Sequence, residues 1–296
     1  MIIYSGGPFH YVAASPLIHA LTQIPFVIDF RDPWYLPGAD GKRLTTLGRR
    51  FYQTIVEPLQ RLAVSRASVV VNVVEEITEL YRRRYSRVPA ERFVTVRNGF
   101  DEELVAGLEP GRRAAITSDT VLAILGKFGY YSAAETRVLC AALAQLPGRL
   151  NARLLVVGPE DRTLSREAAR CGVSERVSWV GPLDYLGALA RGLEATALIV
   201  NTRPYAIGSK VYDYIYLNRP VIAFVRPDDV LNRVLGRFSG FHPVRSVADV
   251  VAAVVSVEDG HRTLYPPGTD IADFSRGAQL AKLAPMLERS VRRCRR

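Results

Sequence analysis

Hydrophobic residues follow two alternating patterns along the chain. Short runs rich in Val, Ile and Leu are typical of strands, and longer segments with an apolar residue every three or four positions are typical of amphipathic helices. In the first third of the sequence, the pattern predicts strands at 2–5, 25–30, 68–73 and 93–96, and helices near 12–22, 42–63 and 75–85. Such alternation indicates an α/β protein with parallel sheets.

A second alternating block follows a polar, aperiodic stretch. It predicts strands at 121–125, 152–157, 177–180, 197–201 and 221–224, and helices near 133–145, 165–171, 186–194, 210–217 and 228–235. The segment 275–292 has the pattern of an amphipathic helix with an arginine-rich end. We therefore expect two Rossmann-like domains, with a first domain at 1–108, a linker at 109–118, a second domain at 119–274 and a basic C-terminal helix at 275–296.

Composition and charge narrow the function classes. The 296 residues are 48% hydrophobic, and 39 Lys+Arg against 29 Asp+Glu give a net charge of +10. The apolar runs are far shorter than the roughly 18–20 residues of a membrane span, and no secretory signal opens the chain, so we expect a cytoplasmic protein. The positive excess favours anionic partners such as nucleotide phosphates or acidic lipid headgroups. Nucleic acid is disfavoured, because the basic residues are scattered among acidic ones.

Several common catalytic motifs are absent from the sequence. There is no G-x-G-x-x-G, P-loop, H-E-x-x-H or G-x-S-x-G motif, so dehydrogenase, P-loop kinase, zinc protease and serine hydrolase activities have no support. The three cysteines, Cys140, Cys171 and Cys294, are widely separated, and no C-x-x-C pair occurs. We expect neither a disulfide framework nor a metal site.

A charged segment comes at the end of the predicted strand 25–30. Asp29, Arg31, Asp32 and Trp34 belong to the string D-F-R-D-P-W. Ligands of open α/β sheets bind at the carboxyl edge of the strands, where these side chains are expected. Carboxylates that flank an arginine can accept hydrogen bonds from sugar hydroxyls, and an indole offers a flat apolar face to a sugar ring. The alternative is a structural ion pair with Trp34 in the core.

A second candidate site begins a predicted helix. Gly208, Ser209 and Lys210 precede the helical pattern, and Asp213 lies one turn further on. Free N–H groups and the positive end of the helix dipole, with a hydroxyl and an ammonium, would form a cradle for a diphosphate. Asp213 could then bind ribose hydroxyls. The alternative is a serine N-cap with a solvated lysine and a surface aspartate.

Three other strand ends carry weaker signals. Lys127 follows the strand 121–125 and could supply a second positive charge to a departing phosphate. Two strands end at glycine, and glycine permits a flat base to approach the backbone closely. These turns contain Gly158, Pro159, Gly181, Pro182 and Leu183.

These segments, in this order, resemble retaining glycosyltransferases of the GT-B fold, in the family 4-like or group 1 set that includes sucrose synthases and lipopolysaccharide glycosyltransferases. The resemblance covers about residues 2 to 285, and its most specific parts are D-F-R-D-P-W and S-K-x-x-[DE]-Y followed by x-P-V-I. It implies two Rossmann-like domains facing across a cleft. It also implies a nucleotide-sugar donor held by the second domain and an acceptor, which is a saccharide, a lipid-linked group or a small molecule, held by the first.

The resemblance also assigns roles to single residues. Lys127 matches the basic residue that touches the donor diphosphate, Ser209 and Lys210 match the phosphate-binding helix start, and Asp213 matches the second acid of the E-x7-E pattern. Asp29 falls among the expected catalytic residues. The implied chemistry needs no metal or other cofactor, because the two lysines and the helix N-terminus stabilise the departing diphosphate.

The sequence departs from the family at three places. Tyr205 stands where the first acid of E-x7-E is expected, and Tyr131, Ser132 and Ala133 occupy the stretch of a second basic residue. The first block has about four predicted strands where such sheets usually carry around six. The chain begins near the family's third or fourth strand, so we expect a truncated first domain, short by roughly 60–120 residues.

Two other functions stay open from the sequence. One is a catalytically inactive nucleotide-sugar-binding module or partner subunit, which the departures favour. The other is a nucleotide-sugar 2-epimerase of the same fold, although its acid and histidine pattern is not evident. The arginines near the C-terminus also suit peripheral contact with an anionic membrane surface.

Overall fold

The chain folds into two compact units in a computed structural model, which describes residues 1–37, 45–109, 119–201, 207–260 and 262–294. The first unit comprises Met1–Asn98 and Arg276–Arg296, and the second comprises Gly99–Ser275. The second unit is thus inserted between two parts of the first. Apart from Glu109, the expected linker lies outside the described residues.

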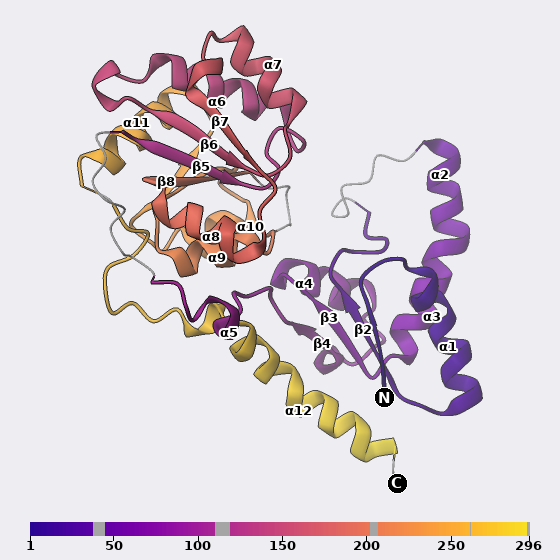
Figure 1. Ribbon diagram of the computed structural model, residues 1–296. Helices are drawn as coiled ribbons and strands as arrows, with labels where there is room; N and C mark the ends of the chain where they lie inside the picture. Colours follow the sequence, from indigo (N-terminus) through magenta and orange to yellow (C-terminus); the bar gives the residue numbers. More distant parts are fainter. Residues whose placement is uncertain (38–44, 110–118, 202–206, 261, 295–296) are drawn as a thin grey trace. The chain divides into compact units, whose positions relative to one another are not determined.

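The first unit is built on a four-stranded parallel sheet in the order β1-β2-β3-β4. These strands are Ile2–Ser5, Phe26–Phe30, Val69–Asn72 and Phe93–Thr95. The connecting segments form α1 (His10–Thr22), α2 (Thr46–Phe51), a π-helical turn (Tyr52–Val56), α3 (Glu57–Arg66) and α4 (Glu75–Arg84). Because the strands follow chain order and crossovers between parallel strands are right-handed, α1, α3 and α4 lie on one face of this sheet (Figure 1).

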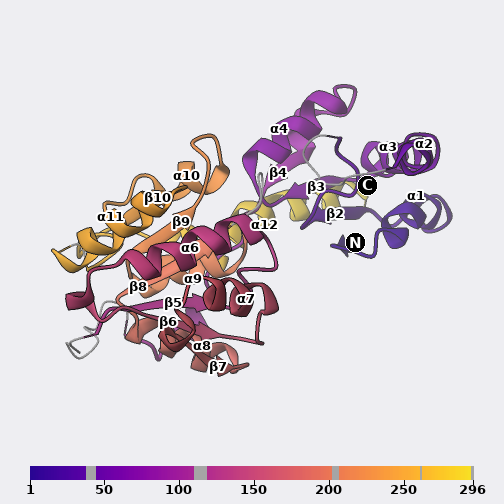
Figure 2. The same ribbon diagram turned by 90° about the horizontal axis from the view of Figure 1, so that it is seen from above.

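The other face of this sheet is covered by α12 (Arg276–Cys294), which comes from the far end of the chain. Val27, Val69, Val71 and Val96 pack against apolar side chains of the helix, namely Leu283, Met286 and Leu287. The main-chain N–H of Arg97 also donates to Gln279 Oε1 at 3.1 Å. Figure 2 shows α12 running beneath β2 and β3.

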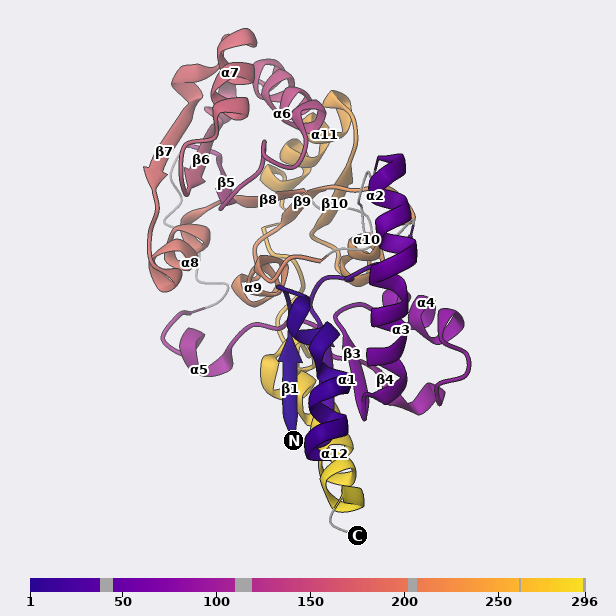
Figure 3. The same cartoon turned by 90° about the vertical axis from the view of Figure 1, so that its right-hand side faces the viewer.

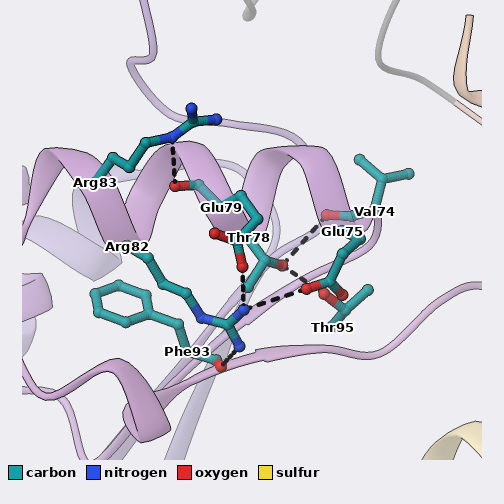
Figure 4. A network of polar contacts seen from close by, with 8 residues as sticks. All are labelled: Val74, Glu75, Thr78, Glu79, Arg82, Arg83, Phe93 and Thr95. Atoms are coloured by element: carbon teal, nitrogen blue, oxygen red, sulfur yellow. Dashed lines mark hydrogen bonds and ion pairs between the residues drawn. The ribbon is translucent and has the colours of Figure 1, made fainter.

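A polar network fixes α4 to β4 (Figure 4). Arg82 pairs with Glu75 at 3.2 Å and with Glu79, and donates to the main-chain oxygen of Phe93 at 2.8 Å. Thr78 and Thr95 share a hydrogen bond of 2.6 Å between their hydroxyls. The helix is therefore held against the strand by these hydrogen bonds and ion pairs as well as by apolar packing.

The second unit has a six-stranded parallel sheet in the order β10-β9-β8-β5-β6-β7. Its strands are Val121–Leu125 (β5), Arg153–Val157 (β6), Val177–Gly181 (β7), Ala197–Asn201 (β8), Val221–Phe224 (β9) and Phe241–Val244 (β10). Helices α6 (Ala133–Gln145), α7 (Arg162–Arg170) and α11 (Val247–Glu258) cover one face (Figure 1). The other face carries α8 (Tyr185–Glu194), α9 (Lys210–Leu217) and α10 (Val230–Leu235).

The predicted elements agree closely with the structure, and the differences have physical causes. Strand β10 and helices α5 (Glu102–Val105) and α11 were not predicted. Strand β10 contains Pro243. An edge strand tolerates proline, which has no N–H to donate, because one side of the strand has no neighbouring strand to accept a hydrogen bond. Helix α11 is rich in β-branched valine, but Ser246 and Asp249 form a capping box at its start.

Candidate functional site

The strand order of the second unit reverses direction between β5 and β8. In doubly wound sheets, the loops that follow such neighbouring strands leave toward opposite faces, and ligands bind at this point, at the carboxyl ends of the strands. The ammonium of Lys210 reaches this point from the start of α9. Its Nζ donates to the main-chain oxygens of Lys127 at 3.3 Å and Leu125 at 3.5 Å, both at the end of β5.

The surroundings of Lys210 change its acidity. Burial lowers the pKa of its ammonium from 10.5 to about 8. The group is thus mostly protonated at neutral pH, but it lacks the water that normally solvates a lysine. An anion that bound at these strand ends would therefore meet a poorly solvated positive charge.

The residues before α9 leave the helix start open. Ser209 has helical backbone angles (φ −53°, ψ −38°), and its side chain makes no capping hydrogen bond. Gly208 and Ser209 are both exposed, and a Cβ on Gly208 would meet nothing within 4 Å. The serine therefore does not act as the N-cap that the alternative interpretation of the sequence expected.

Lys127 contributes its main chain and its side chain separately. Its main-chain oxygen accepts the bond from Lys210, whereas its exposed ammonium lies 5.0 Å from the centroid of the Tyr130 ring. This cation–π contact keeps the positive charge near the end of β5.

Three glycines bring the ends of β5, β6 and β7 together. Gly126, Gly158 and Gly181 have φ values of +92°, +149° and +82°, which side-chain-bearing residues rarely adopt. The N–H of Gly158 donates to Gly181 O at 2.9 Å, and a Cβ on Gly158 would lie 3.3 Å from Gly126 Cα. We call this region of close backbone packing the glycine shelf; Gly158 is buried within it, and the exposed residues Pro159, Pro182 and Leu183 border it.

Asp213 faces inward from α9. Its carboxylate is buried, and its Oδ1 accepts a hydrogen bond of 2.6 Å from the hydroxyl of Tyr185, the first residue of α8. Sequence reasoning missed Tyr185, because a lone tyrosine after the turn Gly181-Pro182-Leu183 carries no motif. Tyr205, which aligns with the first acid of the family pattern, lies outside the described residues.

Asn201 was also missed by sequence reasoning. This buried residue ends β8, and its side-chain amide donates to Phe128 O at 2.9 Å. Its Oδ1 is buried and makes no hydrogen bond within the described part of the chain. Burial also raises the pKa of the nearby Glu135 carboxyl, and Asp229 adds to that effect while Asn201 and Arg226 oppose it.

The first unit gathers polar side chains at the carboxyl ends of β1 and β2. Asp29 Oδ2 accepts from the Ser5 hydroxyl at 2.7 Å and pairs with Arg31 Nε at 3.2 Å. Arg31 also donates to Asn98 Oδ1 at 2.8 Å. The other oxygen of Asp29 is buried and has no hydrogen-bond partner among the described residues.

The other predicted residues of this segment take different environments. Asp32 is exposed, whereas Trp34 is buried and stacks on Phe9 with ring centroids 5.7 Å apart. The indole face that the sequence suggested for a sugar ring thus packs against another aromatic ring. The structure groups Asp29 and Arg31 in the first unit, and Lys127, Lys210 and the glycine turns in the second.

Two searches of the described residues gave negative results. No group of three or more His, Cys, Asp or Glu side chains within them is arranged to hold a metal ion. Within the same residues, no helix is both long enough and apolar enough to cross a bilayer.

Solved structures with a similar fold cover almost the whole chain. Sucrose-phosphate synthase from Thermosynechococcus elongatus has a TM-score of 0.66 and 18% identity, over 97% of this chain and 73% of that chain. The lipopolysaccharide outer core galactosyltransferase WaaB, in its apo form, has a TM-score of 0.60 and 14% identity, over 97% and 98%.

UDP-GlcNAc 2-epimerase from Methanocaldococcus jannaschii has a TM-score of 0.56 and 11% identity, over 97% of this chain and 76% of that chain. No protein-family model matches the sequence, and no curated protein matches it either. The structural likeness confirms the expected fold: the chain has the GT-B fold of glycosyltransferases, with two α/β units built on parallel sheets. At these identities, the likeness establishes the fold and leaves the reaction to the site residues.

Proposed function

We propose that the protein is a glycosyltransferase that moves a sugar from a nucleotide-sugar donor to a saccharide, lipid-linked or small-molecule acceptor with retention of configuration. The observation that carries the proposal is the position of Lys210. Its ammonium sits at the strand-order reversal of a nucleotide-binding type of sheet, at the N-terminus of α9. GT-B glycosyltransferases have the same overall fold.

The donor would bind along the carboxyl edge of the second sheet. Its diphosphate would meet Lys210, Lys127 and the open helix start at Gly208 and Ser209, where positive charge and free N–H groups coincide. Asp213 would accept hydrogen bonds from the ribose, with Tyr185 fixing its orientation. The planar base would lie against the shelf formed at Gly158-Pro159 and Gly181-Pro182-Leu183.

The acceptor would bind to the first unit. Asp29 has one oxygen held by Ser5 and Arg31, and its second oxygen is buried without a hydrogen-bond partner among the described residues, so an acceptor hydroxyl that reached it could donate its proton or a hydrogen bond there. Arg31 and Asp32 would hold further hydroxyls. Trp34 would support this segment from within, through its contact with Phe9.

The chemistry follows from charge. Departure of a nucleoside diphosphate from the sugar leaves a cation-like anomeric carbon, and Lys210, Lys127 and the α9 dipole would stabilise the negative charge that develops on the leaving group. The acceptor hydroxyl would then enter from the face that the diphosphate leaves. The proposal requires no metal. The enzyme would act in the cytoplasm, with 1–108 as the acceptor domain and 119–274 as the donor domain.

Peripheral contact with a membrane is a further part of the proposal. Arg289 and Arg292 are near the end of α12, and Arg292 is exposed. Exposed arginines at the end of this helix suit an anionic lipid surface, on which a lipid-linked acceptor would be presented.

Calorimetric titration of the purified chain with nucleoside diphosphates and nucleotide sugars, without added metal, tests the donor site. We expect one nucleotide to bind saturably, and Lys210→Ala to abolish or strongly weaken that binding. Arg149→Ala is the charge-matched control, because Arg149 is exposed and lies before β6. It is therefore at the amino ends of the strands, whereas Lys210 is at the carboxyl ends.

The products then distinguish the candidate reactions. Transfer to an acceptor supports the transferase. Saturable binding without turnover supports an inactive nucleotide-sugar-binding module. Solvent hydrogen exchange at C2 of the sugar supports the epimerase. Failure of every nucleotide to bind would contradict the proposal.

A further inference from the structure

The helical rod formed by α2, the π-helical turn and α3 has an apolar outer surface. Its outward-facing residues recur every three or four positions along the rod, and they are Leu47, Phe51, Ile55, Leu59 and Leu62. Their exposed fractions run from 37% for Leu59 to 79% for Leu47. We call this row the apolar stripe. It extends about 22 Å at the usual rise of a helix.

The stripe is not part of the core. The rod already packs on the first unit through another face, where Val56, Gln60, Ala63 and Val64 are buried. The amide of Gln60 holds this contact with hydrogen bonds to both main-chain polar groups of Tyr35 at 2.8 and 3.0 Å. A surface helix normally presents polar residues on the side away from its core, so the apolar stripe needs another explanation.

Helix α1 extends the apolar surface. It packs beside α3, and Leu17 and Leu21 on its outer side are exposed. Figure 3 shows α1 alongside the rod of α2 and α3. Exposed apolar side chains therefore occur on two neighbouring helices.

Positive charge borders the stripe. Arg49, Arg50, Arg61 and Arg66 lie on the same rod and are exposed. Between residues 45 and 66 there is one acidic residue, Glu57, and it is paired with Arg61 at 3.2 Å and Arg84 at 2.7 Å. The rod thus offers apolar groups and guanidinium groups together, with its one carboxylate already engaged.

A hollow of about 910 Å³ opens beside the stripe, between α3 and the end of α4. Its lining includes three arginines, two serines and one side chain of the stripe itself, namely Arg61, Arg84, Arg87, Ser65, Ser86 and Leu62. Glu57 offsets one of the three positive charges. Elsewhere on α4, by contrast, two glutamates neutralise Arg82 (Figure 4). The Ser65 hydroxyl donates to the main-chain oxygen of Leu62 at 2.8 Å, so the hollow offers a net positive charge and the hydroxyl of Ser86, which suit a phosphate.

We propose that the apolar stripe and the adjoining arginine-lined hollow form a docking surface for an anionic phospholipid bilayer. Leu47, Phe51 and Ile55 insert among the acyl chains, while the flanking arginines and the hollow bind headgroup phosphates. Shallow insertion of an apolar helix face with basic flanks is how interfacial helices bind membranes. A second copy fits less well, because a symmetric contact would bring the same arginine-rich surface of both copies together, with Glu57 as its one acidic residue between positions 45 and 66.

This inference rests on the proposed function, which includes contact with a membrane. It assigns that contact mainly to the rod and not to α12. It needs neither donor nor acceptor. Vesicle binding and nucleotide binding are therefore measured separately, and failure of one does not imply failure of the other.

The test is co-sedimentation of the full chain with vesicles of phosphatidylcholine alone and of phosphatidylcholine mixed with phosphatidylglycerol. We expect binding to the mixed vesicles that weakens as salt is added. The double variant Phe51→Glu, Ile55→Glu should lower the partition coefficient by about tenfold or more, because two charges replace inserted apolar groups. Leu104→Glu is the matched control, since Leu104 is 51% exposed on α5 of the second unit.

A second pair of variants distinguishes phosphate binding in the hollow from the general attraction of positive charge to anionic vesicles. Arg87→Gln removes a lining arginine, and Arg83→Gln removes an exposed arginine from the same region that does not line the hollow. Arg87→Gln should lower the preference for phosphatidylglycerol several-fold more than Arg83→Gln does. Equal effects of the two variants would overturn the role of the hollow.

The remaining outcomes are also decisive. The double variant Phe51→Ser, Ile55→Ser repeats the test of the apolar stripe without adding charge. For each variant, an unchanged nucleotide affinity and an unchanged circular dichroism spectrum show that the chain is folded. Absence of binding to mixed vesicles, or binding that both double variants retain, would overturn the inference. A dimer seen by sedimentation equilibrium and lost in the stripe variants would assign the surface to a second copy. Binding that inorganic phosphate abolishes and the stripe variants retain would assign the hollow to free phosphate.

Discussion

Tyr185 and Asp213 lie on different helices, α8 and α9, and a 2.6 Å hydrogen bond joins the tyrosine hydroxyl to Asp213 Oδ1. The carboxylate is buried beneath the start of α9, in the turn that follows Lys210. Hydrogen bonds to charged groups are stronger than those between neutral groups. The tyrosine therefore fixes the orientation of the acid proposed to bind the ribose.

Tyr185→Phe should weaken nucleotide binding. The variant keeps the ring but removes the donor, so the carboxylate loses about 1–2 kcal/mol of orienting interaction, and the dissociation constant should rise by about fivefold to thirtyfold. Isothermal titration calorimetry with the preferred nucleotide measures the change. Tyr11→Phe, at an exposed position on α1 of the first unit, serves as the control. An unchanged affinity in Tyr185→Phe would separate Tyr185 from the donor site.

Donor affinity should fall as the pH rises through the pKa of Lys210. Burial lowers that pKa to about 8, so the ammonium is charged below this pH and neutral above it. Only the charged form attracts a diphosphate, and the dissociation constant should therefore increase between about pH 7 and about pH 9. Lys210→Arg should flatten this dependence, because a guanidinium stays protonated throughout the range. A wild-type profile as flat as that of the arginine variant would contradict the role of the ammonium.

Removing the side chain of Lys210 should weaken nucleotide binding and leave the free energy of unfolding almost unchanged. Lys210→Ala should weaken the binding of a nucleoside diphosphate by about 1–3 kcal/mol, the loss typical of a charge-assisted hydrogen bond. Its Nζ bonds in the free protein are long, at 3.3 and 3.5 Å, so the unfolding free energy should change little. Calorimetry and urea denaturation measure the two effects. A protein that loses stability but not affinity would show that the lysine is structural.

Gly158→Ala should destabilise the second unit and disturb the glycine shelf. The residue has φ of +149°, and an added Cβ would lie 3.3 Å from Gly126 Cα, so about 1–3 kcal/mol of unfolding free energy should be lost. Gly148→Ala is the control, since a Cβ there meets nothing within 4 Å. Urea denaturation gives the difference between the variants. Equal stabilities would mean that the backbone at Gly158 relaxes without cost.

Asp29→Asn should reduce sugar transfer without changing donor binding. The substitution preserves shape but removes the negative charge that Arg31 and Ser5 now contact. If Asp29 binds or deprotonates the acceptor, turnover should fall by about 100-fold or more, within the usual range for a general base. Steady-state transfer assays and calorimetry separate the two quantities. A parallel loss of donor affinity would place Asp29 in donor binding or folding.

Much of the fold could be predicted from the sequence, because burial imposes its own periodicity. The run 121–125 is continuously apolar, and so is 197–201 up to its last residue, Asn201; this is expected for strands covered on both faces, and both runs match the structure residue for residue. Strand β10 escaped prediction because Phe241-His242-Pro243-Val244 is short and contains a proline. Edge position, which the sequence does not reveal, is what makes that strand possible.

The site could be predicted only in part. The sequence shows which residues follow a strand, but it does not show which residues from different strands and helices contact one another. The bond from Lys210 to the end of β5 joins residues 83 positions apart. Tyr185 and Asp213 belong to different helices, and neither forms a motif with the other. Trp34 seemed available to a sugar, but its ring packs on Phe9, a contact that no local pattern predicts.

The packing of α12 against β3 has a consequence for synthesis on the ribosome. The first unit begins at Met1, but one face of its sheet is covered by residues 276–294. Translation must therefore deliver the whole second unit before the first can bury its valines. The first unit leaves the ribosome before the second but is completed after it, so its sheet face stays exposed to chaperones and proteases during elongation. Premature termination before residue 276 would leave that face of the sheet uncovered.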